Sequence, residues 1–407
     1  MDCLIIGKVW PEPGSTAAGR RTQDIVLSLS AAGWKIHFAS AAQPGTHALD
    51  LEALGVTTQR VEINASGFDS WIKELAPDVV IFDRFMTEEQ FGWRVAAHCP
   101  DALRVLDTSD LHCLRIAREQ ALKTGQAQNL SNETALREIA SIYRSDLSLM
   151  ISQYELELLC GQFALSEDLI DYWPFSVVPA EATLGFAERA HFMMIGSFLH
   201  PPNLDAARWC RECIWPIIRK ALPETELHLY GSYGERFASE LHAPDSGFHF
   251  KGRAEDSLQT MLQYRLNLAP LRYGAGLKGK VFDGFLTATP TVMTPIAAEG
   301  IASGEGWAQP TPEAFAKQAI ELYSDSQIWR ARQVQEQQLC QERFDPVTWR
   351  PRLPQLLASA LEERAARRQR NFIGQMLRHH HHRSTEFMSR WIEAKKLSPT
   401  SQSGTVA

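Results

Sequence analysis

Short apolar segments alternate with helical segments along the first part of the chain, and this alternation limits the folds that it can adopt. The expected strands are Cys3–Gly7, Lys35–Ser40, Thr58–Ile63, Val79–Asp83, Leu103–Thr108 and Leu147–Ser152. Helical patterns lie between them at Arg20–Ala32, Ser70–Leu75, Glu88–His98 and Leu111–Lys123. Parallel strands that are buried on both faces are apolar runs joined by helices, so the pattern predicts an α/β fold with a parallel sheet.

A second alternation of the same kind follows a candidate hinge at Tyr172–Phe186, where prolines and a glycine interrupt the pattern. Its expected strands are Phe192–Ile195, Glu226–Tyr230, Phe248–Lys251, Leu266–Pro270 and Thr291–Met293. Ligands of such sheets bind beyond the carboxyl ends of the strands. We therefore expect two Rossmann-like domains with a site between them, lined by the loops Gly196–Ser197, Gly231–Ser232, Gly252–Arg253 and Gly274–Lys278.

Length and composition agree with this arrangement. The chain has 407 residues, enough for two domains of about 100–200 residues each. Its net charge of -7 argues against a nucleic-acid partner, for which a basic excess is expected. The seven cysteines are scattered, which disfavours a disulfide framework, and we interpret Cys210 and Cys213 as core residues of a helix rather than a metal or redox pair.

The chain enters its first strand without the basic start and apolar run of a signal peptide. No apolar run approaches the about 18 residues that a membrane span requires. We therefore expect a cytoplasmic protein.

The segment from Leu271 to Ile301 joins a strand end, a glycine-rich turn, two lysines, a helix and a second glycine loop. Gly274 and Gly276 carry no Cβ and allow a ligand to approach the backbone. The helix that follows offers free N–H groups to an anion, and Lys278 and Lys280 add positive charge beside its first turn. This arrangement predicts a phosphate or diphosphate site, although it matches neither the P-loop nor the dinucleotide fingerprint.

The same segment resembles the donor-binding motif of retaining GT-B glycosyltransferases (glycosyltransferase family 4, or glycosyl transferases group 1). The matching residues are Pro270, Leu271, Arg272, Gly274, Gly276, Lys278, Lys280, Asp283, Pro290, Val292, Thr294, Ala298, Glu299 and Gly300. Asp283 stands where the family usually has a glutamate that binds the donor ribose. A second family glutamate, common but not universal, is absent here, and Ala275 stands at its spacing.

The resemblance covers most of residues 1–350 and implies the GT-B architecture. It implies an acceptor-binding domain at residues 1–180, a donor-binding domain at residues 181–350 and a crossover helix at residues 351–370. The implied activity is transfer of a sugar, with retention, from a nucleotide-diphosphate sugar to a glycan, a lipid-linked or another cell-envelope acceptor. We expect no obligatory metal or other cofactor, because fixed cations can stabilise the leaving diphosphate and no D-x-D motif occurs.

Four residues are our candidates for catalysis: Lys278, Arg253, Asp107 and His112. Arg253 follows a strand and either contacts phosphate or base, or pairs with a nearby acid on the surface. Asp107 and His112 belong to a segment that resembles a subgroup motif, D-x-x-D-L-H-x-x-R, and could orient the acceptor or the sugar. An aspartate at such a place is also a common helix N-cap.

The remaining candidates surround these four. The donor-binding set is Ser197, Arg272, Gly274, Gly276, Lys280, Asp283 and Glu299. Gly19 and Arg20 belong to a loop after the first strand that is expected near the acceptor or the diphosphate. A solvent-facing helix lysine is the alternative for Lys280, and a loop or N-cap acid is the alternative for Glu299.

The last segment, residues 371–407, mixes arginines with exposed-type apolar residues. It is either a basic amphipathic helix on the inner membrane surface, or a solvated helix or partly disordered tail. We expect His379–His382 to bind metal adventitiously or to have no role. The alternative to a transferase is a non-catalytic GT-B-like protein that binds a nucleotide sugar or acts as a scaffold.

Overall fold

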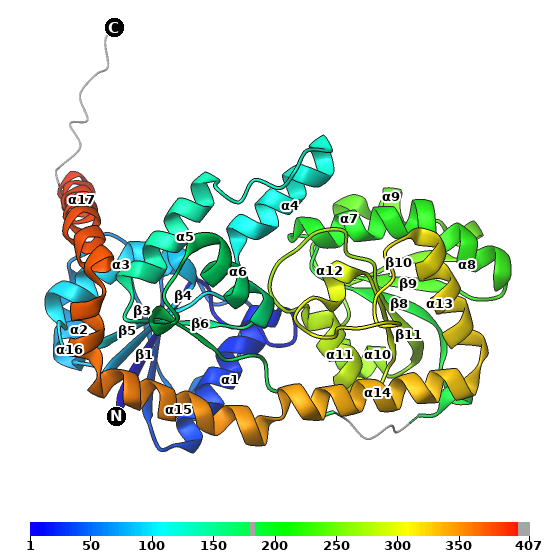
Figure 1. Ribbon diagram of the computed structural model, residues 1–407, viewed down its shortest axis with the longest axis horizontal. Helices are drawn as coiled ribbons and strands as arrows, with labels where there is room; N and C mark the ends of the chain where they lie inside the picture. Colours follow the sequence, from blue (N-terminus) through cyan, green and yellow to red (C-terminus); the bar gives the residue numbers. More distant parts are fainter. Residues whose placement is uncertain (180–183, 398–407) are drawn as a thin grey trace, which may run out of the picture.

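The protein contains two parallel sheets, one in each half of the chain (Figure 1). This computed structural model describes residues 1–179 and 184–397. The first sheet has the strand order β3-β2-β1-β4-β5-β6-β7, and the second has the order β10-β9-β8-β11-β12. The strand order reverses beside β1 in one sheet and beside β8 in the other. The predicted α/β fold with two Rossmann-like sheets is confirmed.

Mostly apolar strands form the first sheet, and helices cover its two faces. The strands are β1 (Asp2–Gly7), β2 (Lys35–Ser40), β3 (Thr57–Arg60), β4 (Val79–Asp83), β5 (Leu103–Asp107), β6 (Leu147–Met150) and β7 (Ile170–Tyr172). The helices are α1 (Ala17–Ala31), α2 (Gly67–Leu75), α3 (Arg84–His98), α4 (His112–Thr124), α5 (Glu133–Arg144) and α6 (Gln153–Phe163). The short edge strand β7 has no counterpart among the strands expected from the sequence.

The second sheet is smaller and is also parallel. Its strands are β8 (Ala190–Ile195), β9 (Leu227–Tyr230), β10 (Phe248–Gly252), β11 (Tyr264–Ala269) and β12 (Thr291–Met293). Its helices are α7 (Pro201–Trp209), α8 (Trp215–Ala221), α9 (Ala238–Leu241), α10 (Ser257–Met261), α11 (Gly279–Thr287), α12 (Pro295–Ala298) and α13 (Pro312–Ser324). A π-helical turn at Cys210–Ile214 joins α7 to α8. It buries Cys210 and exposes Cys213, so only one of the pair is a core residue.

The chain returns from the second half to the first through two consecutive helices (Figure 1). Helix α14 (Ser326–Phe344) buries Trp329 and Phe344 in the second core, whereas α15 (Pro346–Glu362) packs on α1. The backbone N–H of Val177 donates to the carbonyl oxygen of Phe344 at 2.9 Å, so the outgoing and returning connections lie side by side. The predicted crossover at residues 351–370 falls on α15 and α16 (Arg364–Arg370). The predicted boundary between residues 180 and 181 lies outside the described residues.

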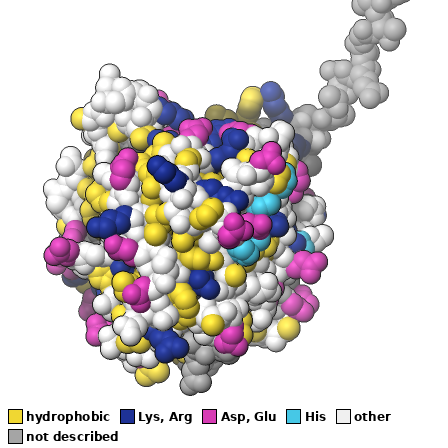
Figure 2. Space-filling view, turned by 90° about the vertical axis from the view of Figure 1, so that its right-hand side faces the viewer, with side chains coloured by type: hydrophobic (Ala, Val, Ile, Leu, Met, Phe, Trp, Pro, Cys, Tyr) yellow, Lys and Arg dark blue, Asp and Glu magenta, His cyan; other side chains and the backbone are white. Residues whose placement is uncertain are grey.

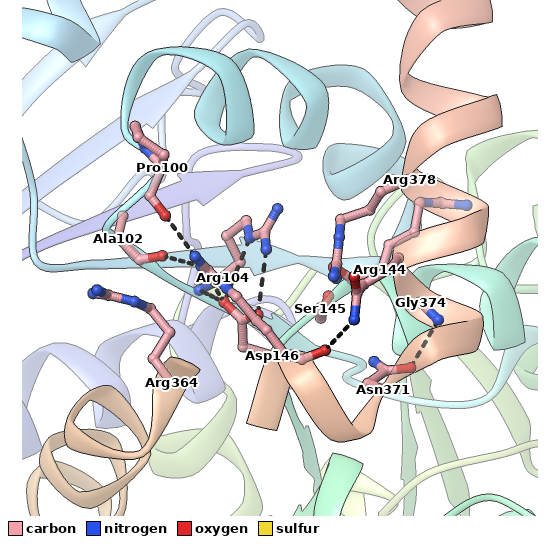
Figure 3. A network of polar contacts seen from close by, with 12 residues as sticks. Pro100, Ala102, Arg104, Arg144, Ser145, Asp146, Arg364, Asn371, Gly374 and Arg378 are labelled. Carbon is pink, nitrogen blue, oxygen red and sulfur yellow. Dashed lines mark hydrogen bonds and ion pairs between the residues drawn. The ribbon is translucent and has the colours of Figure 1, made fainter. Parts of the chain in front are cut away.

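The segment after the crossover is a helix docked on the first half of the chain. Helix α17 (Phe372–Leu397) packs along α3 and α5. Arg378 donates to the carbonyl oxygen of Arg144 at 3.0 Å (Figure 3). Just before the helix, Arg368 pairs with Asp146 at 2.7 Å. Residues 372–397 therefore form a helix that is docked on the first half and keeps many exposed side chains, and residues 398–407 lie outside the described residues. No described helix is both long and apolar enough to cross a membrane.

Candidate functional site

The glycine-rich unit lies after β11 and contacts the opposite half of the chain. Gly276 has a φ of 64°, and a Cβ atom there would lie 2.8 Å from the Cβ of Asp110, in the loop between β5 and α4. Helix α11 begins directly after Lys278, which occupies its N-cap position. The expected order of turn, lysine and helix N-terminus is therefore present, and it faces the carboxyl edge of the first sheet.

Lys278 is buried, with 6 % of its surface exposed. Its Nζ donates to the carbonyl oxygen of Gly276 at 2.7 Å and lies 3.8 Å from Oε1 of Glu299. Burial lowers the pKa of Lys278 to about 8. A lysine with such a pKa sits close to its titration range at neutral pH, and the nearby Glu299 favours its charged form.

Arg118 of α4 reaches across from the first half and holds two parts of the glycine unit. Its guanidinium donates to both carboxylate oxygens of Glu299, at 2.8 and 2.6 Å, and to the carbonyl oxygen of Gly274 at 2.8 Å. The sequence prediction missed this residue. Its one signal was its spacing of three from Arg115, which puts both arginines on the same face of a helix.

Glu155 of α6 was also missed, and it is fully buried at the same contact. Its Oε1 accepts from the backbone N–H of Gly276 at 2.6 Å and from that of Leu111 at 3.2 Å, while its Oε2 has no partner among the described residues. Burial, helped by the charge of Asp110, raises the pKa of Glu155 to about 7. In the sequence the residue completes an S-x-x-E pattern with Ser152, which is typical of a helix-capping role.

A cluster of ionisable side chains lies next to Glu155, around the start of α4. Nε2 of His112 is 3.2 Å from Asp110, and the guanidinium of Arg115 is 3.4 Å from the same carboxylate. Although burial opposes it, the hydrogen bond from His112 and the charge of Arg115 hold the pKa of Asp110 well below its usual range. Arg115 also contacts Nε2 of His200 from the second half at 2.8 Å. Arg115 and His200 therefore lie beside His112, where the two halves meet.

Lys280 is held by the loop after β8. Its Nζ donates to Oδ1 of Asn203 at 2.7 Å, and the Asn203 amide donates to the carbonyl oxygen of Ser197 at 2.8 Å. Burial lowers the pKa of Lys280 to about 8, with Asp283 opposing this shift. Asn203 thus links Lys280 to the backbone of Ser197, and Lys280 does not face open solvent.

Asp283 pairs with Arg20 of α1 across the two halves. The carboxylate that was predicted to bind ribose is 4 % exposed and already has this cationic partner. Gly19 precedes Arg20 in the first turn of α1, where a Cβ atom would lie 2.5 Å from the backbone of Glu12. Close packing against the loop before α1 therefore explains why a glycine stands at position 19. Arg20 lies beside α11, the helix that carries Asp283.

Three predicted residues lie apart from this cluster. Asp107 is buried and paired with Arg21 at 2.9 Å, which gives its carboxylate a structural partner rather than access to a ligand. Arg272 is partly exposed and pairs with Asp205 of α7. Arg253 is exposed and has no ion pair among the described residues, so the alternative surface pair with a nearby acid is absent there.

A cavity of about 230 Å³ lies on the hinge side of this contact, between α1 and α11. Its lining includes Arg20, Phe175, Gly279 and Phe282. In the cluster itself, acids and bases from opposite halves satisfy one another, with Arg118 on Glu299 and Arg20 on Asp283. Two lysines, two arginines and a helix N-terminus at one place can bind an anion with several negative charges.

Comparison with known proteins identifies the fold. Residues 189–325 match the family model "Glycosyl transferases group 1". No curated protein sequence matches the chain. Among solved structures, Anabaena HepE in complex with UDP and glucose is 15 % identical, with a TM-score of 0.67, and the match covers 88 % of this chain and 100 % of that one.

Two further structures agree. The sucrose-phosphate synthase of Thermosynechococcus elongatus is 13 % identical with a TM-score of 0.67, and the match covers 88 % of this chain and 98 % of that one. WaaG, a glycosyltransferase involved in lipopolysaccharide biosynthesis, is 12 % identical with a TM-score of 0.59, covering 88 % of this chain and 99 % of that one. The chain thus has the fold of the GT-B glycosyltransferases, and residues 189–325 in its second half are similar to the glycosyl transferases group 1 model.

Proposed function

We propose that the protein is a retaining glycosyltransferase that uses a nucleotide-diphosphate sugar. The observation that carries the proposal is the buried Lys278 beside Gly276, directly before the N-terminus of α11. When the bond between the anomeric carbon and the diphosphate breaks, negative charge develops on the leaving group. Lys278, Lys280 and the helix N-terminus are fixed in place before the reaction, which is the condition for strong electrostatic stabilisation.

Donor binding in this proposal is an exchange of partners. Glu155 accepts from the Gly276 N–H, and Glu299 neutralises Lys278 and Arg118. A diphosphate oxygen takes the Gly276 N–H from Glu155 and shares the cations with Glu299. Because these cations supply the charge stabilisation, we propose that no metal is obligatory. Retention of configuration is proposed from the family resemblance, with the leaving diphosphate assisting deprotonation of the acceptor.

The acceptor binds on the first half of the chain in this proposal, near His112, Arg115 and Arg20. We propose a glycan, a lipid-linked or another cell-envelope acceptor. A nucleotide-sugar-binding scaffold without catalysis is the second candidate, favoured by Ala275 at the place of the second family glutamate and by the Arg20–Asp283 pair.

The test is calorimetric titration with UDP, GDP and ADP, each with Mg²⁺ and with EDTA. We expect one nucleotide to bind in both buffers, and Lys278→Ala to bind it about tenfold to a hundredfold more weakly, on the scale of one charge-assisted hydrogen bond. Lys317→Ala, an exposed lysine on α13, is the matched control and should bind as the parent does. Failure to bind any nucleotide, or equal binding by Lys278→Ala, would overturn the site assignment.

Catalysis is tested separately, with the nucleotide sugar of the base that binds. Release of the nucleoside diphosphate that depends on added acceptor, and a product whose anomeric proton coupling matches the donor, would support a retaining transferase. Tight nucleotide binding without turnover on any acceptor of the proposed classes would favour the scaffold.

Contact with an anionic membrane surface is proposed for α17, in a protein located in the cytoplasm. Its exposed apolar side chains are Phe372, Ile373, Met376, Phe387, Met388 and Trp391, and basic residues such as Arg390 and Lys395 lie among them. Apolar side chains next to basic ones suit the interface of an anionic bilayer. Deleting the helix would uncover α3 and α5, so side-chain replacement is the cleaner test.

The variant Phe387→Ser/Trp391→Ser should lose most of its binding to phosphatidylglycerol vesicles in a flotation assay and keep its nucleotide affinity. Leu136→Ser removes an exposed leucine on α5 and is the control. Equal flotation of both variants and the parent would exclude α17 as the contact.

A further inference from the structure

Three potential metal ligands converge in the second half of the chain, away from the site between the sheets. They are Glu226, just before β9, His228 on β9 and His249 on β10, and one ligand atom from each lies within 4.8 Å of the others. His228 and His249 are register partners in the parallel pair, so their side chains project from the same face of the sheet. Histidine side chains reach the surface beside acidic ones at this end of the molecule (Figure 2).

The distances between the ligand atoms are close to those of a tetrahedral metal site. Nε2 of His228 is 2.7 Å and Nε2 of His249 is 3.6 Å from Oε2 of Glu226. Ligands about 2.1 Å from a tetrahedral zinc ion are about 3.4 Å from one another. A small rotation of the partly exposed Glu226 side chain would therefore bring all three ligands to one ion.

Tyrosine hydroxyl groups behind His228 fix the orientation of its ring. Nδ1 of His228 is 2.6 Å from the hydroxyl of Tyr264, which is 2.8 Å from the hydroxyl of Tyr230. If Nδ1 donates its proton to Tyr264, the lone pair of Nε2 points at the Glu226 carboxylate. Two acceptors face each other in that state, and a cation between them removes the repulsion. An outer hydrogen bond that fixes a ligating histidine is a regular feature of metal sites.

Two neighbouring histidines complete the surroundings without acting as ligands. Nδ1 of His191 accepts from the backbone N–H of Glu226 at 3.1 Å, and Nδ1 of His242 accepts from that of Phe250 at 3.2 Å. In the neutral form the proton of each ring is therefore on Nε2, which cannot bind a metal. Three protein ligands and one water are thus available, an arrangement found for zinc.

We propose that Glu226, His228 and His249 bind one Zn²⁺ ion that holds β10, the edge strand of the second sheet, to β9. The site lies near the amino ends of these strands, whereas the glycine unit lies at the carboxyl edge of the same sheet. The ion therefore binds apart from the proposed donor site and takes no part in the reaction proposed above. The proposal is independent of the proposed function, because its evidence and its test involve the metal alone.

The test is a titration of the full chain with Zn²⁺ alone by calorimetry, supported by the absorption spectrum of bound Co²⁺. The parent for this experiment carries His379→Gln, His380→Gln and Cys213→Ser, which remove exposed adventitious ligands. We expect one equivalent of Zn²⁺ to bind and to raise Tm. His249→Ala should bind at least about tenfold more weakly, and its Tm should not respond to Zn²⁺. His47→Ala, an exposed histidine elsewhere, should match the parent.

Binding of no Zn²⁺ by the parent, or equal binding by His249→Ala, would overturn the proposal. If His249→Ala fails to fold, Glu226→Gln removes a ligand from a more exposed position and should show the same loss. Tyr264→Phe keeps all three ligands and removes the hydroxyl that contacts Nδ1 of His228 and the Tyr230 hydroxyl, so it should weaken Zn²⁺ binding by about tenfold. Nucleotide affinity should be unchanged in each variant, which separates this outcome from failure of the proposed donor site.

Discussion

The two sheets face each other with edges of different chemical character. The first sheet presents charged side chains from its helices and from the loop before α4, among them Asp110, Arg115, Arg118 and Glu155. The second presents glycine loops and the backbone N–H groups before α11, with two lysines. The first edge therefore supplies side-chain charge, and the second adds backbone donors to the charge of its two lysines. The conformation of the glycine unit therefore depends on the opposite edge, because Glu155 and Arg118 already satisfy its backbone groups from there.

Removing the strongest link between the edges should have the largest effect. Arg118→Ala leaves the Glu299 carboxylate and the Gly274 carbonyl without their shared partner. Losing one member of a buried ion pair costs about 3–5 kcal/mol, so amide exchange in residues 271–278 should accelerate strongly. Arg137→Ala breaks an exposed pair with Glu89 and should cost at most about 1 kcal/mol. Equal protection in the two variants would show that Arg118 does not join the edges.

Glu155→Gln should stabilise the protein in a pH-dependent manner. The folded state raises the pKa of Glu155 from 4.5 to about 7, so stability falls as the pH rises through this range. Glutamine never ionises, and its advantage should grow from pH 5 to a plateau above pH 7, reaching about 3 kcal/mol at most. Calorimetric Tm values at several pH values measure this difference. Glu157→Gln, an exposed carboxylate on the same helix, should follow the parent. A constant difference at all pH values would contradict the prediction.

Two glycine variants distinguish the cost of backbone strain from the cost of a clash between the edges. The expected difference in stability between them is the smallest of the three effects. Gly276 and Gly125 have φ values of 64° and 69°, but only at Gly276 would a Cβ atom meet Asp110. Alanine at Gly125 should cost about 1 kcal/mol of strain. Alanine at Gly276 should cost a further 1–2 kcal/mol or so from overpacking. Thermal unfolding measures both, and equal losses would mean that the edges separate freely in solution.

The sequence predicts the second edge better than the first because its signals are local. Gly276, Lys278 and the start of α11 lie within a few residues, and their roles in the turn follow from short-range geometry. Arg118 and Glu299 are 181 positions apart, and Glu155 and Gly276 are 121 apart. Only folding brings such pairs together, so a pattern such as S-x-x-E points to capping instead. For Asp107 the sequence led to the opposite error, because a catalytic role was predicted for a carboxylate that pairs with Arg21. In the sequence, a free carboxylate at a strand end cannot be distinguished from one that is held in an ion pair.

The same limit applies to the last segment. A basic amphipathic pattern predicts a helix equally well for a tail in solvent, on a membrane or on protein. The contacts of Arg378 and Ser389 with the first half decide the matter for α17, and they come from residues far away in the chain. Fold class was predictable because periodicity alone carries it, whereas the partners of a surface helix depend on tertiary structure.

The bond between Val177 and Phe344 has a mechanical consequence. The polypeptide passes between the halves only twice among the described residues, and this bond ties the two passages together at one point. Because the two connections are joined at this point, rotation of the halves about it meets the least resistance, whereas sliding and separation of the halves are resisted. Opening would then be a single-axis swing, with the largest travel at the residues farthest from Phe344 and almost none at the α14–α15 junction.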